Sequence, residues 1–258
     1  MGILNITPDS FFGGSRYNTD EEIIFAARRM LDEGAAILDV GGYSSRPGAA
    51  EITKEEERKR VIRAIRLVKS DFPDAVISVD TFRSDIALEA VLDAGADMIN
   101  DISGGEADSK MFSAVVRVNV PYIMMHMKGA PATMQNNAVY DDIVADILKY
   151  FSEKIFRLRT AGVKDIIIDP GFGFAKTTDH NFELMSRLED LGIAGLPIMV
   201  GISRKSMIWK TLDITPDEAL NGTTALHAVA LLKGADILRV HDIKEAVEAV
   251  RLVARLKN

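Results

Sequence analysis

The chain has 258 residues, of which 47% are hydrophobic and 27% charged, and its formal net charge is −7. This length and composition suit one globular domain over residues 1–258, and an acidic chain is a poor non-specific binder of nucleic acid. The sequence contains no cysteine, which excludes disulfides and thiolate ligands, and no apolar run is long enough to cross a bilayer. These features favour a cytoplasmic protein that neither spans nor binds a membrane.

Eight apolar segments that end in polar side chains are the predicted strands. In chain order they cover residues 1–5, 33–40, 75–80, 94–101, 121–126, 161–170, 196–201 and 233–242. A helical pattern with one apolar stripe follows each strand, at residues 20–34, 54–70, 84–95, 109–118, 140–162, 180–192, 216–234 and 243–258. This alternation predicts an α/β fold, the (β/α)8 TIM barrel. Because Met1 already lies in the first strand, we expect the N-terminal segment of such a barrel to be truncated.

Local signals mark where these helices begin and end. Thr19, Thr53 and Ser84 are the expected N-caps. The expected helix-terminating glycines are Gly34, Gly95, Gly162 and Gly234.

The polar tips of the strands converge in such a barrel, because its active site lies where the carboxyl ends of the strands meet. Three of these tips are carboxylates, Asp39, Asp80 and Asp169. A buried carboxylate needs a partner, so each one either forms a structural ion pair or accepts hydrogen bonds from adjacent N–H groups of a heterocycle. The ammonium of Lys205 suits the opposite, accepting edge of such a ring. Both interpretations stay open on the residues alone.

Basic residues gather at the same strand ends although the chain is acidic. They are Arg46, Arg204, Lys205 and Arg239. Such a local cluster is typical of a site for a small anionic substrate. Arg239 and His241 alternate along one strand, so they point to the same side and could clamp an anion together.

Asn5 allows two interpretations. Its side chain either caps the turn that follows the first strand or offers an oxygen to Mg²⁺ carried by a substrate diphosphate. No pair of histidines has the spacing of a zinc site.

The remaining histidines and two phenylalanines are weaker candidates. His126 stands at a strand end and is a functional candidate, whereas His180 is expected to cap a helix and His227 to pack inside one. Phe172 and Phe174 alternate, so they either line an aromatic slot or belong to the core.

Eight motifs in this order resemble the dihydropteroate synthases, the folate-pathway enzymes of the pterin-binding barrel family. They are MGILNITPDSF, DVGGYSSRPGA, SVDTFR, NDISGG, MMHMKG, DPGFGFAK, GISRKSMI and RVHD, and they extend from Met1 to the last helix. The resemblance implies an enzyme that joins 4-aminobenzoate to 6-hydroxymethyl-7,8-dihydropterin diphosphate, giving 7,8-dihydropteroate and diphosphate with Mg²⁺. It also implies a homodimer formed through the later helices, where Leu226, Val229, Leu231 and Leu232 could equally face the barrel.

The resemblance carries roles onto matching residues. It assigns the metal to Asn5 and the pterin to Asp80, Asn100, Asp169 and Lys205. Met125, Gly201 and Arg239 would wall the ring, and Arg239, His241 and Asn5 would hold the diphosphate above Asp39. The aminobenzoate would be bordered by Phe174, Ser203 and Lys205, under the loop residues Phe11, Ser45, Arg46 and Pro47. The residues expected to act in catalysis are Asp39, Asp80, Lys205, Arg239 and His241.

Some positions depart from the family pattern, and two other functions stay open. Tyr43 stands where many relatives have Glu, Ser45 where Thr is common, and Phe12-Gly13 where Ser-Asp is common, which bears on loop closure. One alternative is a methyltetrahydrofolate-dependent methyltransferase of the same barrel family, which has little use for the anion-binding SSRPGA and SRK segments. The other is a noncatalytic pterin-binding barrel, because a fold does not determine a function.

Overall fold

The computed structural model describes residues 1–6, 19–43, 52–129 and 138–257. Several sequence-based assignments therefore lie outside the described residues: Phe11, Phe12, Gly13, Ser45, Arg46 and Pro47. The strands are β1 (Gly2–Asn5), β2 (Leu38–Gly41), β3 (Ile77–Asp80), β4 (Met98–Asp101), β5 (Tyr122–Met125), β6 (Ile166–Asp169), β7 (Met199–Val200) and β8 (Ile237–Leu238). Each one falls within a segment predicted as a strand, except that β2 extends one residue further, to Gly41.

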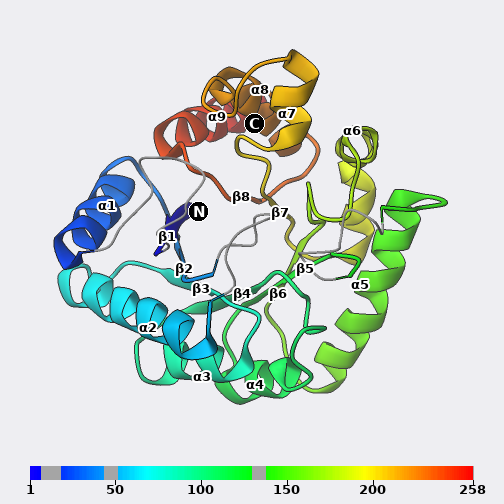
Figure 1. The fold of residues 1–258 in the computed structure, drawn as a ribbon. Helices are drawn as coiled ribbons and strands as arrows, with labels where there is room; N and C mark the ends of the chain where they lie inside the picture. Colours follow the sequence, from blue (N-terminus) through cyan, green and yellow to red (C-terminus); the bar gives the residue numbers. More distant parts are fainter. Residues whose placement is uncertain (7–18, 44–51, 130–137, 258) are drawn as a thin grey trace.

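These strands close into a barrel. The first six form one parallel sheet in chain order, and β7 pairs with β8 in parallel. A single parallel bridge between Ile168 and Ile198 joins β6 to the β7 segment, and another between Gly2 and Val240 joins β1 to the β8 segment. Figure 1 shows the strands in the centre of a ring of helices. The predicted (β/α)8 barrel is confirmed.

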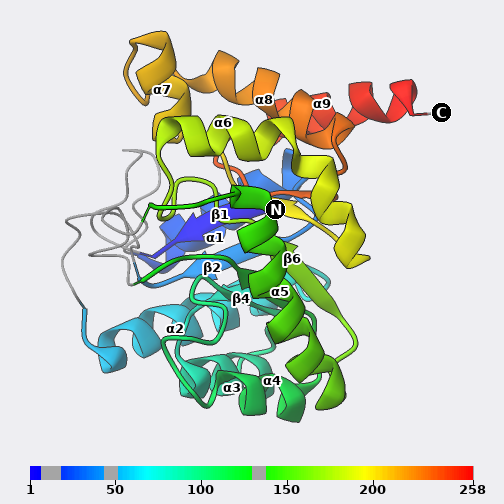
Figure 2. The same cartoon turned by 90° about the vertical axis from the view of Figure 1, so that its right-hand side faces the viewer.

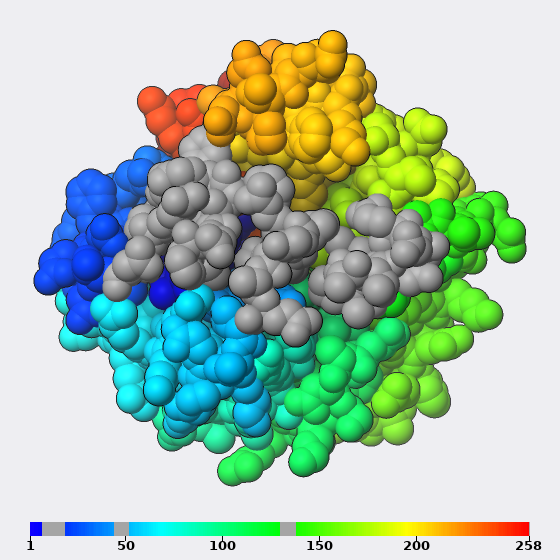
Figure 3. All heavy atoms as spheres, in the orientation of Figure 1, coloured from blue at the N-terminus to red at the C-terminus, as the bar shows by residue number. Residues whose placement is uncertain are grey.

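The helices surround this barrel in chain order, as the ribbon in Figure 1 and the surface in Figure 3 show. They are α1 (Asp20–Asp32), α2 (Lys54–Asp71), α3 (Ser84–Leu92), α4 (Met111–Val118), α5 (Ile143–Thr160), α6 (Thr178–Ser186), the 3₁₀ helix η2 (Leu188–Ala194), α7 (Ser206–Leu212), α8 (Leu220–Leu232) and α9 (Ile243–Leu256). Among the described residues, no helix is long and apolar enough to span a membrane.

Two helical predictions need correction. The pattern over residues 180–192 is not one helix, because α6 ends at Ser186 and a 3₁₀ segment follows it. Helix α7 was not predicted at all, since its seven residues are too short to display a helical period.

The predicted helix ends are mostly confirmed. Thr19 forms a capping box with Glu22, and the Thr53 hydroxyl accepts a hydrogen bond from the Glu56 N–H at 3.2 Å. The four predicted glycines all have positive φ, at 98°, 88°, 95° and 97° in chain order. The Ser84 prediction is wrong, because Arg83 holds the N-cap position and the Asp108 carboxylate accepts from the Ser84 N–H at 2.8 Å. A side chain from the next βα loop thus caps α3.

The barrel interior has an apolar floor. Side chains alternate along each strand, so Leu38 and Val40 pack outward against the helices while Asp39 points inward. The inward residues at the amino ends of the strands form a separate apolar cluster: Met98, Ile123, Ile167 and Met199, with Met1, Ile37 and Ile237 packed against them. Polar side chains lie nearer the carboxyl ends of the strands, and the apolar cluster closes the barrel interior on their amino-terminal side.

Candidate functional site

One arginine joins two inward-facing carboxylates at the centre of the barrel. Arg239, directly after β8, donates from Nε to Oδ2 of Asp39 at 2.6 Å and from Nη2 to Oδ2 of Asp80 at 2.6 Å. Asn100 donates from Nδ2 to the same Asp39 oxygen at 3.0 Å. Residues from β2, β3, β4 and the end of β8 therefore meet, although up to 200 positions separate them in the chain. The structural ion-pair interpretation holds for Asp39 and Asp80.

Two carboxyl groups face one guanidinium at this centre. Asp39 is fully buried, and its Oδ1 has no hydrogen-bond partner within the described part of the chain. Burial raises the pKa of the Asp80 carboxyl above its ordinary value, although the charge of Arg239 opposes this. Burial by itself lowers the pKa of Arg239, but Asp39 and Asp80 outweigh it and raise that pKa. The arginine stays a cation, and one guanidinium is shared by two carboxyl groups.

Asp169 and Lys205 form the second charged pair of the site. Asp169 ends β6, and its Oδ1 accepts from the Gly171 N–H at 2.8 Å. Burial raises the pKa of Asp169 and lowers that of Lys205 to about 8, while each residue's charge opposes the shift of the other. The Lys205 ammonium donates to the carbonyl of Phe172 and lies 4.6 Å from the centre of the Phe174 ring. The carboxylate and the ammonium thus lie in one site, as the sequence predicted.

An apolar wall lies beside these charges. Met125 packs with Ile102, Met127 and Ala175, and the half-buried Phe82 and Phe174 lie against this cluster. Gly201 lies next to two charged residues of the site, because a Cβ there would stand 3.8 Å from the Cβ of Arg239 and 4.0 Å from the Lys205 ammonium. Flat apolar surface next to paired charges suits a planar heterocycle with polar edges.

The predicted aromatic slot is only half present. Phe174 lies at the site, but Phe172 is fully buried in the main core between barrel and helices. Of the two interpretations, core packing therefore holds for Phe172, because the positive φ of the intervening Gly173 breaks the alternation that an extended segment would have.

Asn5 lies next to the Asp80 carboxylate. The two flank Gly41, where a Cβ would stand 3.3 Å from Asn5 Oδ1 and 3.5 Å from Asp80 Oδ2. Within the described ranges, no group of three or more histidine and acidic side chains could hold a metal ion.

His241 is held as a neutral ring. Its backbone N–H donates to Ser203 Oγ at 3.2 Å, and its Nδ1 lies 3.1 Å from the same hydroxyl. Because burial lowers the pKa of His241 to about 4, the ring is uncharged at neutral pH. With the serine hydrogen directed to Nδ1, the ring proton is on Nε2 and can be donated to an anion.

Several predicted residues serve the scaffold instead. Arg204 is not part of the basic cluster, because it binds Asp242 through Nε at 2.8 Å and through Nη2 at 2.9 Å. His126 points away from the site, with its ring 4.8 Å from that of Tyr150, and burial lowers its pKa to about 2. His227 is buried in α8 as predicted.

The sequence analysis missed two buried charged residues near the site. Glu57 is fully buried in α2 and accepts from the Thr81 hydroxyl at 2.6 Å, directly beside Asp80. Lys176 is buried in the loop between β6 and α6. A signal existed for Glu57, because it occupies the apolar stripe of its helix together with Val61, Ile65 and Val68. For Lys176 the only signal was its place directly behind a glycine-rich loop.

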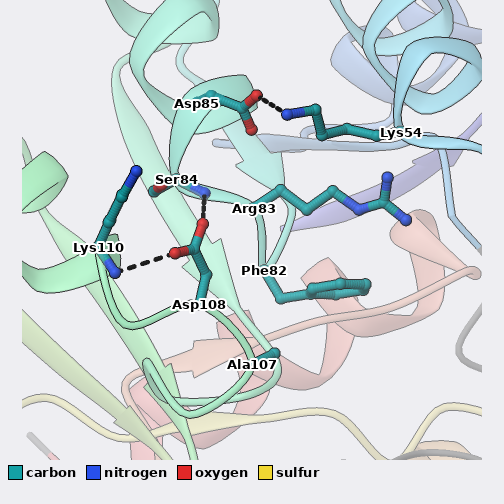
Figure 4. A pocket seen from close by; sticks show the side chains of 8 residues that line it. All are labelled: Lys54, Phe82, Arg83, Ser84, Asp85, Ala107, Asp108 and Lys110. Atoms are coloured by element: carbon teal, nitrogen blue, oxygen red, sulfur yellow. Dashed lines mark hydrogen bonds and ion pairs between the residues drawn. The ribbon is translucent and has the colours of Figure 1, made fainter.

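A separate pocket of about 370 Å³ opens at the amino end of α3, and Phe82 contributes to its lining (Figure 4). Its charges pair with one another: Lys54 with Asp85 at 2.5 Å, and the Asp108 carboxylate with the Ser84 N–H and the Lys110 N–H. Because these groups compensate one another, the pocket is a weaker candidate than the barrel centre.

Comparisons with known proteins agree with this geometry. Residues 1–241 match the family described as pterin binding enzyme. The dihydropteroate synthase of Escherichia coli strain K12 is 44% identical over 255 residues, covering 98% of this chain and 89% of that protein. The Yersinia pestis dihydropteroate synthase, solved with a sulfonamide drug, has a TM-score of 0.94 and 40% identity, covering 99% of this chain and 93% of that one. The Clostridium difficile enzyme, solved in the presence of pteroic acid, has a TM-score of 0.90 and 39% identity, covering 99% and 95%.

Proposed function

Because the chain belongs to the dihydropteroate synthase family of pterin-binding enzymes, we propose how its own residues perform that family's reaction. The enzyme is a transferase of folate synthesis, and it joins 6-hydroxymethyl-7,8-dihydropterin diphosphate to 4-aminobenzoate with release of diphosphate. The observation that carries the proposal is the placement of two acid–base pairs beside one apolar wall, Asp80 with Arg239 and Asp169 with Lys205.

The pterin ring binds between the charged tips and the apolar wall. Asp169 accepts from adjacent N–H groups of the ring, while Lys205 donates to its carbonyl edge. Asp80 and Asn100 bind the remaining polar atoms, and Met125 contacts one ring face. The burial of Asn100 and Asp169, beside the partly buried Asp80 and Lys205, supports this, because buried polar groups need hydrogen-bond partners. Gly201 leaves room for Arg239 to stack on the opposite face.

The diphosphate binds at the rim formed by Asn5, Arg239 and His241. The neutral His241 ring donates from Nε2, and the Asn5 amide offers an oxygen to Mg²⁺. Mg²⁺ suits this place because it needs only one or two protein ligands when substrate phosphates supply the others. When bound, the ion supplies positive charge that neutralises phosphoryl oxygens. Purified protein titrated with Mg²⁺ should show tight metal binding only when the pterin diphosphate is present, and Asn5→Ala should weaken it.

The 4-aminobenzoate lies across Phe174, with Ser203 and Lys205 at its border. Support comes from the position of the Lys205 ammonium over the Phe174 ring, which places a cation beside an aromatic surface. We propose that Phe11, Ser45, Arg46 and Pro47 close over the substrates and exclude water. Replacing Arg46 with Ala should raise the KM for 4-aminobenzoate more than that for the pterin.

The reaction proceeds by cleavage of the exocyclic C–O bond before C–N bond formation. The electron pair of the C–O bond leaves with the diphosphate, and the resulting cation is delocalised into the pterin. The carboxyl groups of Asp39 and Asp80 beside the ring favour that cation. The neutral amine of 4-aminobenzoate then attacks and releases one proton, so no strong general base is required. Positional isotope exchange in the diphosphate substrate should occur without 4-aminobenzoate, and its absence would exclude this order.

An assay of diphosphate release distinguishes the synthase from the two alternative functions, a methyltransferase and a noncatalytic binding barrel. Release that requires both organic substrates and Mg²⁺ identifies the synthase. Pterin binding without turnover would identify a binding barrel. Methyl transfer from methyltetrahydrofolate would identify the methyltransferase.

We also propose a homodimer formed through the later helices. Large apolar side chains are exposed on α7, α8 and α9, which lie together on one side of the barrel (Figure 2). They are Leu212 at 51%, Leu232 at 53%, Leu252 at 71% and Leu256 at 73% exposure. Contact with a second copy would remove this apolar surface from water. Sedimentation of the protein and of Leu252→Glu tests this, because the substitution should shift a dimer toward monomer.

A further inference from the structure

The end of β6 and the loop that follows it supply three groups to the proposed site. They are the Asp169 carboxylate from the strand, and the Phe172 carbonyl that accepts from Lys205 and the Phe174 ring from the loop. The backbone of this loop is unusual, with positive φ at Gly171 (72°), Gly173 (79°) and the non-glycine Ala175 (49°). Ala175 is fully buried in this conformation, which costs an L-residue energy. Side-chain contacts must hold the loop in this shape.

Lys176, near the end of this loop, binds the backbone of the same loop through its side chain. Its side chain is only 3% exposed, and its ammonium donates to the carbonyls of Gly171 at 3.0 Å and Phe174 at 3.1 Å. The third neighbour is Nδ1 of His126, at 3.1 Å. An ammonium has three N–H donors, and these three acceptors satisfy all of them. His126 can accept because burial keeps its ring neutral, with its pKa lowered to about 2.

We propose that Lys176 is a positioning residue for the condensation, acting as a three-point clip that holds the loop so that Phe174 and the Phe172 carbonyl meet the aminobenzoate and Lys205. This inference rests on the proposed function. It assigns the neutral His126, which does not face the substrates, the role of the third acceptor of the clip. Two further contacts support the same loop: the Tyr140 hydroxyl donates to the Ala175 carbonyl at 3.0 Å, and Asn181 Oδ1 accepts from the Gly173 N–H at 2.7 Å.

The clip also carries charge into the site. The groups whose charges act on Lys176 are Asp169 at the end of β6, Lys205 before α7 and Lys128 after β5. Burial lowers the pKa of Lys176 to about 7, and Asp169 opposes this. In return, the Lys176 charge favours the ionised form of Asp169. Loss of the ammonium therefore removes both the clip and a charge that keeps Asp169 an acceptor.

A comparison of two buried lysines tests the proposal. Lys154 on α5 is a matched control, because it is 8% exposed and also donates to a loop carbonyl, that of Gly104 at 2.8 Å. Its loop lies after β4 and supplies only the apolar side chain of Ile102, and no polar group, to the proposed site. Lys176→Met and Lys154→Met each keep the aliphatic stem and remove the donors. We expect both to lower the melting temperature, so stability alone does not distinguish them.

The kinetic constants distinguish the two variants. Lys176→Met should raise the KM for 4-aminobenzoate on the order of tenfold to a hundredfold, since small displacements of a positioned group have effects of this size. The KM for the pterin diphosphate should rise less, and Lys154→Met should leave both constants within about twofold of the unmodified enzyme. Equal KM values in Lys176→Met and Lys154→Met would overturn the proposal.

A second variant keeps the test decisive if Lys176→Met does not fold. Tyr140→Phe removes one hydroxyl that supports the same loop through the Ala175 carbonyl, and it should raise the KM for 4-aminobenzoate by about twofold to tenfold without changing kcat as strongly. An unchanged KM in that variant counts against the clip. Failure of the proposed function is a different result, because the unmodified chain would then release no diphosphate with both substrates present.

Discussion

Buried carboxylates on the two faces of the barrel wall have opposite environments. Asp101 faces outward and accepts four hydrogen bonds, from two backbone N–H groups and from the hydroxyls of Ser103 and Tyr122. Asp39 faces inward, where one oxygen accepts from Arg239 and Asn100 while the other has no partner among the residues described. The outward carboxylate is fully bound within the scaffold, whereas the inward one keeps capacity for a ligand.

A raised pKa does not separate the two kinds of carboxyl group. Burial raises the pKa of Asp101 on the outer face and of Asp80 on the inner face. The difference lies in their partners, because hydrogen bonds to Asp101 stabilise its charged form while Asp80 depends on a shared arginine. The hydrogen-bond partners of these two carboxyl groups therefore distinguish them, whereas the direction of their pKa shifts does not.

The largest expected effect comes from exchanging one carboxylate for an amide on each face. Asp80→Asn should lower kcat/KM at least about a hundredfold, because it removes charge that stabilises the developing cation. Asp101→Asn should instead destabilise the fold by about 1–3 kcal/mol, because an amide cannot accept all four hydrogen bonds. Steady-state kinetics and urea unfolding measure the two effects. Loss of turnover in the folded Asp101→Asn variant would contradict the division into inner and outer roles.

Removal of the shared arginine should have the largest effect on stability. Arg239→Leu leaves the carboxylates of Asp39 and Asp80 without their cation, which costs about 3–5 kcal/mol. Arg239→Lys should lie between that variant and the unmodified protein, because one ammonium cannot reproduce the fork that bridges two carboxylates. Urea unfolding of the two variants at neutral pH checks this order. Equal stabilities of the two variants would argue that charge alone, without the bridge, is sufficient.

Two buried histidines should each make the stability of the protein depend on pH. Burial lowers the pKa of His241 in the site and of His227 in α8 from 6.5 to about 4. The unfolded chain therefore binds more protons than the folded one between these values, so stability is lost as pH falls from about 6.5 toward 4. His241→Gln and His227→Gln should each flatten this slope in urea unfolding. Only His241→Gln should also weaken diphosphate binding, and a kinetic effect of His227→Gln would contradict this assignment.

The smallest effect is expected at the pocket beside α3. The Lys54–Asp85 pair is half exposed, with side-chain exposures of 59% and 50%. Lys54→Ala should change stability by less than about 1 kcal/mol and leave kcat/KM unchanged. A clear rise in either KM would show that this pocket belongs to the substrate site after all.

The sequence predicted the fold well because each strand is a short apolar run with a polar end. The sequence could not show which of the adjacent residues Asn100 and Asp101 points into the barrel, because neighbouring strand residues point to opposite faces and both of these are polar. Their orientation depends on packing against the helices, which places Tyr122 outside the barrel to meet Asp101. The same limit explains Arg204, whose positive φ turns it toward Asp242 and away from the predicted basic cluster.

The carboxylates of the site could be predicted from the sequence, whereas the side-chain contacts that hold the neighbouring loop could not. A buried lysine such as Lys176 is recognised only when its three acceptors are seen together, and two of them belong to a loop with positive φ. Short helices carry no period either, so α7, which begins next to Lys205, was missed.

The short strands β7 and β8 should affect the motion of the barrel wall. Strands β7 and β8 have two residues each, and single bridges attach this pair to the neighbouring strands. Lys205 and Arg239 follow these two strands in the chain. Lys205 donates to a carbonyl in the loop after β6, and Arg239 donates to carboxylates of the six-stranded sheet. A bound pterin would contact both the β7–β8 pair and the six-stranded sheet, and would reduce local opening between them. Amide deuterium exchange at residues 198–201 and 237–240 should therefore slow on pterin binding more than exchange in β2 or β3.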